Sequence, residues 1–120
     1  MDKKLTGRFG EQAAADYLKK KRYKLVGLNY SCRFGEVDII AADTRYIVFA
    51  EVKLRKSDGF AEAKEFVTRA KQKKIIKTAA LWLSQNETGL QPRFDVIEIY
   101  AAGGASSAAV KINHIENAFQ

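Results

Sequence analysis

The chain has 120 residues, of which 47% are hydrophobic and 29% charged, and this composition excludes a disordered segment. It lacks the apolar run of a signal peptide and the ~18 apolar residues of a membrane span, and its one cysteine, Cys32, excludes an internal disulfide. We therefore expect one cytoplasmic domain over residues 1–120, without membrane contact.

The net charge of +7 is unevenly distributed along the chain. Residues 1–77 contain 19 Lys and Arg against 10 Asp and Glu, whereas residues 78–120 contain 2 against 4. Such a concentrated positive field favours a polyanionic partner, because each neutralised phosphate releases counterions. The alternative is that the protein is simply soluble and basic, as many small proteins are.

The hydrophobic pattern predicts two helices and a sheet. The expected elements, in chain order, are a helix over residues 6–21, strands over 23–30, 36–42 and 46–55, a helix from about 61 to 85, a strand over 93–100, a flexible loop over 101–109 and a short strand near 110–113. The order αβββαβ, followed by the short last strand, predicts an α/β fold with a central mixed sheet flanked by helices.

The turn between the second and third strands sets a register that brings charged residues together. If the turn at residues 43–46 is symmetric, Asp38 lies opposite Glu51 and Glu36 lies opposite Lys53. Opposed side chains have Cβ atoms about 5 Å apart. A bulge or an odd-length loop would shift this pairing by one residue.

Two adjacent carboxylates repel each other unless a cation lies between them or one is protonated. Oxygen ligands without histidine or cysteine fit Mg²⁺ or Mn²⁺, and such an ion can activate water and polarise a phosphodiester. A neighbouring lysine can orient the water or stabilise charge on the phosphate. The alternative is a ladder of salt bridges on an exposed sheet face. Against it, Ile40, Ile47 and Phe49 share the face and predict that it is covered.

These residues resemble a known group of nucleases. Residues 35–40 (GEVDII) and 49–55 (FAEVKLR) look like the D…(E/D)-x-K signature of the restriction-endonuclease-like superfamily, also written PD-(D/E)XK. The closer match is the YraN-type bacterial family, which is similar in outline to archaeal Holliday junction resolvases. Further matches are residues 10–14 (GEQAA), Asn29, the lysine-rich second helix, residues 93–97 (RFDVI) and residues 117–119 (NAF).

The resemblance implies an α/β/α sandwich and a role for each motif residue. It makes Asp38 and Glu51 metal ligands, together with the main-chain carbonyl of Val52, and Lys53 the catalytic lysine. Glu11 is similar to an acidic residue that the first helix brings to the same site. The implied cofactor is Mg²⁺ or Mn²⁺.

The second helix also offers a polar residue, Gln72, similar to one that some superfamily members place at the site. Gln72 shares a helical face with three apolar residues, Ile76, Ala79 and Leu83. The alternative is an ordinary surface amide. Glu36 is either an outer group of the metal site or a salt-bridge partner of Lys53, and we favour the salt bridge.

Basic residues near the motif are candidates for phosphate contact. They are Arg55, Lys56, Lys71, Lys73 and Lys74. A solvated helix face is the alternative for some of them. His114 is expected to be solvated or structural, and Cys32 lacks the partners of a zinc site or a nucleophile.

The function expected from this resemblance is metal-dependent cleavage of DNA, branched or structured DNA above all. One alternative is a non-catalytic nucleic-acid-binding module that retains the nuclease fold. Another is a protein-interaction domain whose acidic face docks a basic partner, and the positive charge of residues 1–77 argues against it. A two-fold homodimer would allow both strands to be cut.

Overall fold

The computed structural model describes residues 3–56, 67–101 and 110–120. The elements are α1 (Lys3–Lys20), β1 (Lys24–Cys32), β2 (Gly35–Ala42), β3 (Tyr46–Lys56), α2 (Arg69–Gln85), β4 (Gln91–Ala101) and β5 (Val110–Phe119). The strands form one sheet in the order β1-β2-β3-β4-β5, in which only β3 and β4 run parallel. The predicted α/β fold with a mixed sheet is thus confirmed.

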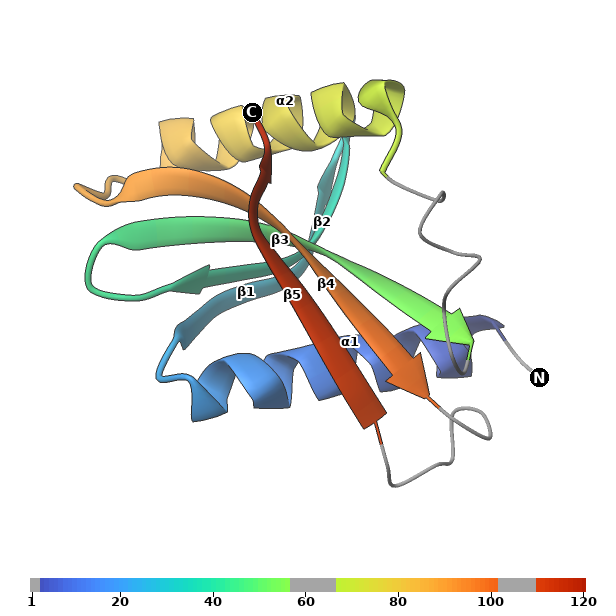
Figure 1. Ribbon diagram of the computed structural model, residues 1–120. Coiled ribbons are helices and arrows are strands. Elements are labelled where there is room, and N and C mark those ends of the chain that lie inside the picture. Colours follow the sequence, from blue (N-terminus) through green and yellow to red (C-terminus); the bar gives the residue numbers. More distant parts are fainter. Residues whose placement is uncertain (1–2, 57–66, 102–109) are drawn as a thin grey trace.

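The two helices cover opposite faces of the sheet, so the molecule has three layers (Figure 1). Under α1, Ala14 and Leu18 pack with strand residues such as Val48. On the other face, α2 buries Ile75 against a second cluster that includes Phe49. Both faces of β3 are therefore apolar over residues 47–50, as expected for a central strand between two helical layers.

The register predicted for the β2–β3 hairpin is confirmed, from Ala42↔Ile47 to Ile39↔Ala50. The turn contains no favoured glycine pair, and the Asp43 carboxylate stabilises it instead. One oxygen of this carboxylate accepts hydrogen bonds from the main-chain N–H groups of Arg45 and Tyr46, at 2.8 and 2.7 Å. An aspartate that bonds main-chain groups two and three residues on is a common turn-forming device.

Beyond Ile39 and Ala50 the two hairpin strands separate. β2 continues with β1 as far as Gly35, and β3 continues with β4 as far as Lys56. We call this point of separation the fork. The main-chain N–H of Val52 has lost its neighbouring strand there, and the Asp38 carboxylate accepts its hydrogen bond at 2.8 Å. The fork therefore brings a carboxylate to a main-chain edge inside the sheet.

Most observed element boundaries lie within three residues of the sequence prediction, and two differ by more. α2 begins at Arg69, whereas we expected a start near residue 61; residues 57–66 lie outside the described part. Thr68 is the N-cap of α2, and its side chain accepts a hydrogen bond from the N–H of Lys71. β5 continues to Phe119 instead of ending near residue 113, because it pairs with β4 along its length. Most of the predicted loop, residues 102–109, also lies outside the described part. Within the described residues, no helix is long and apolar enough to cross a membrane.

Candidate metal centre

The fork opens into a pocket of about 400 Å³ between β2, β3 and the first turns of α2. Its lining has an acidic and a basic side. Glu36, Asp38 and Glu51 come from the two strands, and Lys71 and Lys74 come from α2. Such a pocket has suitable groups for a cation on one side and for a phosphate on the other.

Three carboxylates converge at the acidic side. Oxygen atoms of Glu11, Glu36 and Asp38 all lie within 4.8 Å of one another, in the part of the chain that the structure describes. Glu11 comes from α1 and the other two from β2, so the fold assembles the group from separate elements. Hard oxygen donors of this kind fit Mg²⁺ or Mn²⁺ better than Zn²⁺. This group can accommodate a metal ion, and it includes Glu36, which we had favoured as a partner of Lys53.

The electrostatics of Asp38 reflect its burial and the acidic groups around it. Burial, together with the charges of Glu51, Glu11 and Glu36, raises the pKa of Asp38 to about 7, against the lowering effect of the Val52 N–H. A carboxyl held in this way is only partly ionised at neutral pH. A divalent cation would oppose the shift, because it would compensate the neighbouring negative charges.

Glu51 is compensated within the protein. Its side chain is only 5% exposed, and the same oxygen, Oε2, lies 2.8 Å from Nζ of Lys71 and 3.8 Å from Nζ of Lys53. The predicted pairing of Glu36 with Lys53 is thus replaced by a pairing of Glu51 with two lysines. The cause is the fork, because β2 and β3 have separated before Glu36 and Lys53 could lie opposite each other.

The main-chain groups of Val52 lie at the fork. Its N–H points to Asp38 across the fork, and the N–H and C=O of one strand residue point to the same edge. The Val52 carbonyl therefore also faces the fork.

The helix residue that reaches the carboxylates is Lys71 rather than Gln72. The Gln72 side chain turns back and donates a hydrogen bond to the carbonyl of Val67 at 2.9 Å. The buried face of α2 contains Ile75 and Thr78, and Lys71 precedes them by four and seven residues. The apolar residues of the predicted stripe, Ile76, Ala79 and Leu83, do pack against the sheet. The buried face also includes Ile75 and Thr78, and the periodicity starting from these two would have identified Lys71.

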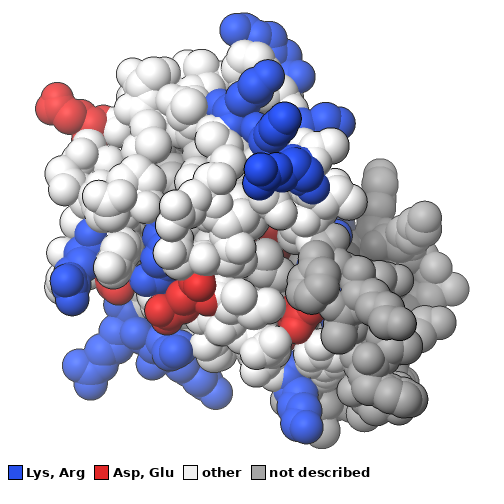
Figure 2. All heavy atoms as spheres, turned by 45° about the horizontal axis from the view of Figure 1, so that its top comes forward, with Lys and Arg blue, Asp and Glu red and all other residues white. Residues whose placement is uncertain are grey.

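The predicted phosphate contacts divide into two groups. Arg55 is buried, with Nη2 3.1 Å from Oε2 of Glu98 on β4, so we correct its assignment to a structural ion pair. The side chain of Lys56 lies outside the described part. Lys71, Lys73 and Lys74 are exposed on α2. Figure 2 shows one group of Lys and Arg side chains at the upper right and others at the lower left and bottom of this view, whereas acidic side chains are scattered.

Comparison with known proteins identifies the family of the chain. Residues 10–99 match the family described as "Uncharacterised protein family UPF0102". The chain belongs to this family. A UPF0102 protein of Caldanaerobacter subterraneus subsp. tengcongensis is 45% identical over 120 residues, which cover 99% of this chain and 98% of that protein. UPF0102 proteins of Geobacter sulfurreducens and Vibrio parahaemolyticus are 42% and 43% identical over 118 residues, covering 98% and 97% of this chain and 90% and 93% of theirs.

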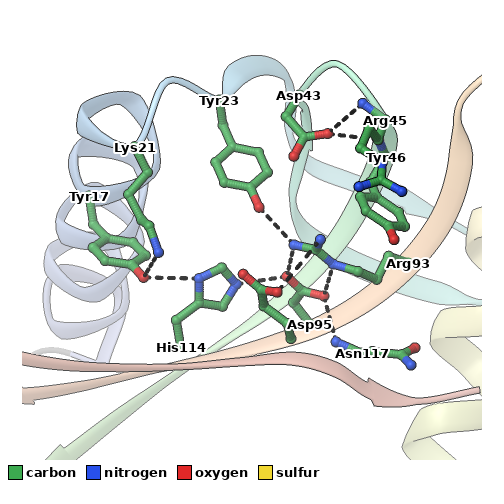
Figure 3. A network of polar contacts seen from close by, with 11 residues as sticks. Tyr17, Lys21, Tyr23, Asp43, Arg45, Tyr46, Arg93, Asp95, His114 and Asn117 are labelled. Carbon is green, nitrogen blue, oxygen red and sulfur yellow. Dashed lines mark hydrogen bonds and ion pairs between the residues drawn. The ribbon is translucent and has the colours of Figure 1, made fainter.

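A second polar network explains the RFDVI and NAF motifs of this UPF0102 chain (Figure 3). Asp95 on β4 is fully buried, and Arg93 approaches both of its oxygens, with donor distances of 2.9 and 2.8 Å. Nε2 of His114 lies 2.7 Å from Asp95, and the main-chain N–H of Asn117 donates to it at 3.0 Å. Burial would raise the pKa of Asp95, but the hydrogen bonds from His114, Arg93 and Asn117 lower it.

The network joins three elements of the UPF0102 fold. Nδ1 of His114 on β5 lies 3.0 Å from the Tyr17 hydroxyl on α1, and Arg93 donates to the Tyr23 hydroxyl at 2.8 Å. None of these described residues lines the pocket at the fork. His114 therefore has the structural role expected of it, in a buried rather than a solvated position.

Proposed function

We propose that the protein is a Mg²⁺- or Mn²⁺-dependent DNA endonuclease of the restriction-endonuclease-like superfamily, acting on branched or structured DNA. The observation that carries this proposal is the cluster of carboxylates from α1 and β2 at the fork. Glu51 of β3 lines the same pocket as Asp38 and lies near Lys53 and Lys71. The YraN-type motif assigns chemical roles to these same residues. A single domain over residues 1–120, in the cytoplasm, is part of the proposal.

Asp38, Glu51 and the Val52 carbonyl would hold the ion, with Glu11 as a further acidic ligand and Glu36 beside them. When bound, the ion would supply an activated water molecule and polarise the phosphodiester. Lys53 would orient that water and stabilise the developing negative charge on the phosphate. Hydrolysis adds the water across one P–O bond of the backbone.

The basic side of the pocket would position the substrate. Lys71 and Lys74 line the same pocket as the carboxylates, and Lys73 lies on the same helix. Lysines contact backbone phosphates without reading sequence, so we expect recognition of DNA shape rather than of a base sequence. Binding should weaken steeply as salt concentration rises.

The decisive test combines metal binding with cleavage. Mg²⁺ and Mn²⁺ are titrated calorimetrically into the wild type and into the double variant Asp38→Ala, Glu51→Ala. Branched, single-stranded and duplex DNA are then incubated with each protein. The double variant should lose metal binding and cleavage together. Asp16→Ala is the matched control, because Asp16 is an exposed carboxylate on α1 whose hydrogen bond is to Gln12. Undiminished cleavage by the double variant would refute the site.

One observation favours a second candidate function, a non-catalytic nucleic-acid-binding module. Both ion pairs of Glu51 within the described residues are with lysines, and a carboxylate neutralised by the protein itself does not require a metal. Such a module would bind DNA without turnover, and Asp38→Asn would leave its affinity unchanged. Loss of DNA affinity in Asp38→Asn, in the presence of Mg²⁺, would exclude it.

A two-fold homodimer is proposed as the unit that cuts both strands, because one small site addresses one strand at a time. Light scattering with and without DNA tests this. A monomer under both conditions at working concentration would exclude the dimer and leave the site unaffected.

A further inference from the structure

We propose that Lys71 is an internal substitute for the metal ion. Its ammonium group forms an ion pair with Glu51 in the metal-free protein, and this ion pair must break when the metal ion binds. This inference rests on the proposed function, because it takes Glu51 to be a metal ligand. It adds a competitor built into the same chain, and thereby a link between metal binding and phosphate binding.

The contact that carries the proposal is short and shielded from water. Nζ of Lys71 lies 2.8 Å from Oε2 of Glu51, whose side chain is only 5% exposed. An ionised carboxylate with so little access to water requires a positive partner inside the protein. In the metal-free protein the nearer of its two lysine partners is Lys71, since Nζ of Lys53 is at 3.8 Å from the same oxygen.

Lys71 is also the partner that is free to move away. Its side chain is 47% exposed, against 29% for Lys53. Its main chain is fixed by the hydrogen bond that its N–H donates to the Thr68 hydroxyl at 3.1 Å. A flexible four-carbon stem on an anchored backbone allows the ammonium group to exchange one position for another without any change in the fold.

Mutual exclusion follows from the shared oxygen. A metal ion bound to Oε2 of Glu51 would take the position that the ammonium group occupies, and the two cations would repel each other at close range. The released ammonium group would stay beside Lys74 at the basic side of the pocket, where a backbone phosphate would be its natural partner. Metal binding would thereby promote phosphate binding, and the reverse would also hold.

The experiment measures the affinity for Mn²⁺ alone, by calorimetric titration without nucleic acid. Lys71→Met removes the competitor and keeps the length of the side chain, so it should bind Mn²⁺ about three- to tenfold more tightly than the wild type. Lys71→Arg retains a cation that can pair with Glu51 and should bind Mn²⁺ with an affinity close to that of the wild type. Lys73→Met is the matched control, because Lys73 is exposed on the same helix and does not line the pocket; its affinity should equal that of the wild type.

The outcomes separate the two proposals. If the wild type binds Mn²⁺ and Lys71→Met binds it equally or more weakly, the competition is refuted and the metal site stands. If neither the wild type nor Lys71→Met binds Mn²⁺, the metal centre itself is refuted, and the competition with it. If Lys71→Met and Lys73→Met both bind Mn²⁺ more tightly than the wild type, the gain in affinity comes from the lower net positive charge of the protein. This outcome would also refute a specific role for Lys71. Circular dichroism verifies that each variant is folded.

Discussion

Asp38→Asn should stabilise the metal-free protein, and the gain in the free energy of unfolding should grow with pH. Burial, together with the charges of Glu51, Glu11 and Glu36, raises the pKa of Asp38 from 3.8 to about 7. A group with a raised pKa contributes stability that is fully present below its unfolded-state pKa and is lost as the pH rises through its folded-state pKa. The wild type therefore loses stability between pH 5 and pH 7, at ~1.4 kcal/mol per pH unit, or ~2–3 kcal/mol in all. The variant has no such loss, and its amide oxygen can still accept the Val52 N–H.

The assay is urea denaturation in the presence of a chelator, at pH 5 and pH 8, for both proteins. The stabilisation by Asp38→Asn should be ~2–3 kcal/mol larger at pH 8 than at pH 5, and the comparison between pH values cancels effects of the amide itself. Asp16→Asn should show little difference, because Asp16 is exposed. Equal gains at both pH values would refute the electrostatic reasoning. At pH 8, Mn²⁺ should then stabilise the wild type and not Asp38→Asn.

Three further variants test the rest of the fold by chemical denaturation. Asp95→Ala should lower the free energy of unfolding by ~3–5 kcal/mol, because it leaves Arg93 and His114 buried without their carboxylate. The stability that the Asp95 carboxylate contributes is present above its unfolded-state pKa of 3.8 and is lost as the pH falls through its lowered folded-state pKa. The free energy of unfolding of Asp95→Ala should therefore fall less steeply with acid than that of the wild type. An unchanged dependence on acid pH would contradict this. Gly10→Ala should stabilise α1 by about 1 kcal/mol, because the added Cβ would meet Leu54 and Val52 at 3.6 and 3.7 Å, which is ordinary contact. Gly35→Ala should lower the free energy of unfolding by about 1–2 kcal/mol, because Gly35 has a φ of 154° and the added Cβ would lie 3.3 Å from Cβ of Lys74. An unchanged free energy of unfolding would show that the turn between β1 and β2 can shift.

The sequence predicted those features that depend on local rules. The β2–β3 register followed from the symmetric turn at residues 43–46, and the observed pairing of Ile39 with Ala50 agrees with it. Strand alternation predicted that the face containing Ile40 and Phe49 is covered, and α2 covers it. These predictions succeeded because side-chain direction in a strand alternates with a period of two and needs no tertiary information.

The features that failed depend on tertiary geometry. The fork cannot be read from β2 or β3 alone, because it results from the pairing of β2 with β1 and of β3 with β4. Because the two strands separate at the fork, Glu36 does not lie opposite Lys53, and its carboxylate lies near that of Glu11 instead. Arg55 follows the motif lysine by two residues and is nevertheless buried, because β4 presents Glu98 to it. The positive charge of Arg55 alone could not show whether its side chain is buried or is exposed for contact with phosphate.

The described part of the fold contains a fully buried aspartate, Asp95, and a half-buried one, Asp38, in opposite electrostatic states. Asp95 has a guanidinium, an imidazole and a main-chain N–H as partners, and its pKa is lowered. Asp38 has one main-chain N–H and three acidic neighbours, and its pKa is raised. The same chain thus lowers the pKa of one carboxyl and raises that of the other, although the charge of Lys71 also acts on Asp38. A carboxyl whose pKa is raised by burial and by acidic neighbours is where an external cation gains most from binding. This contrast, more than the number of acidic residues at the fork, is the physical reason to look for the metal there.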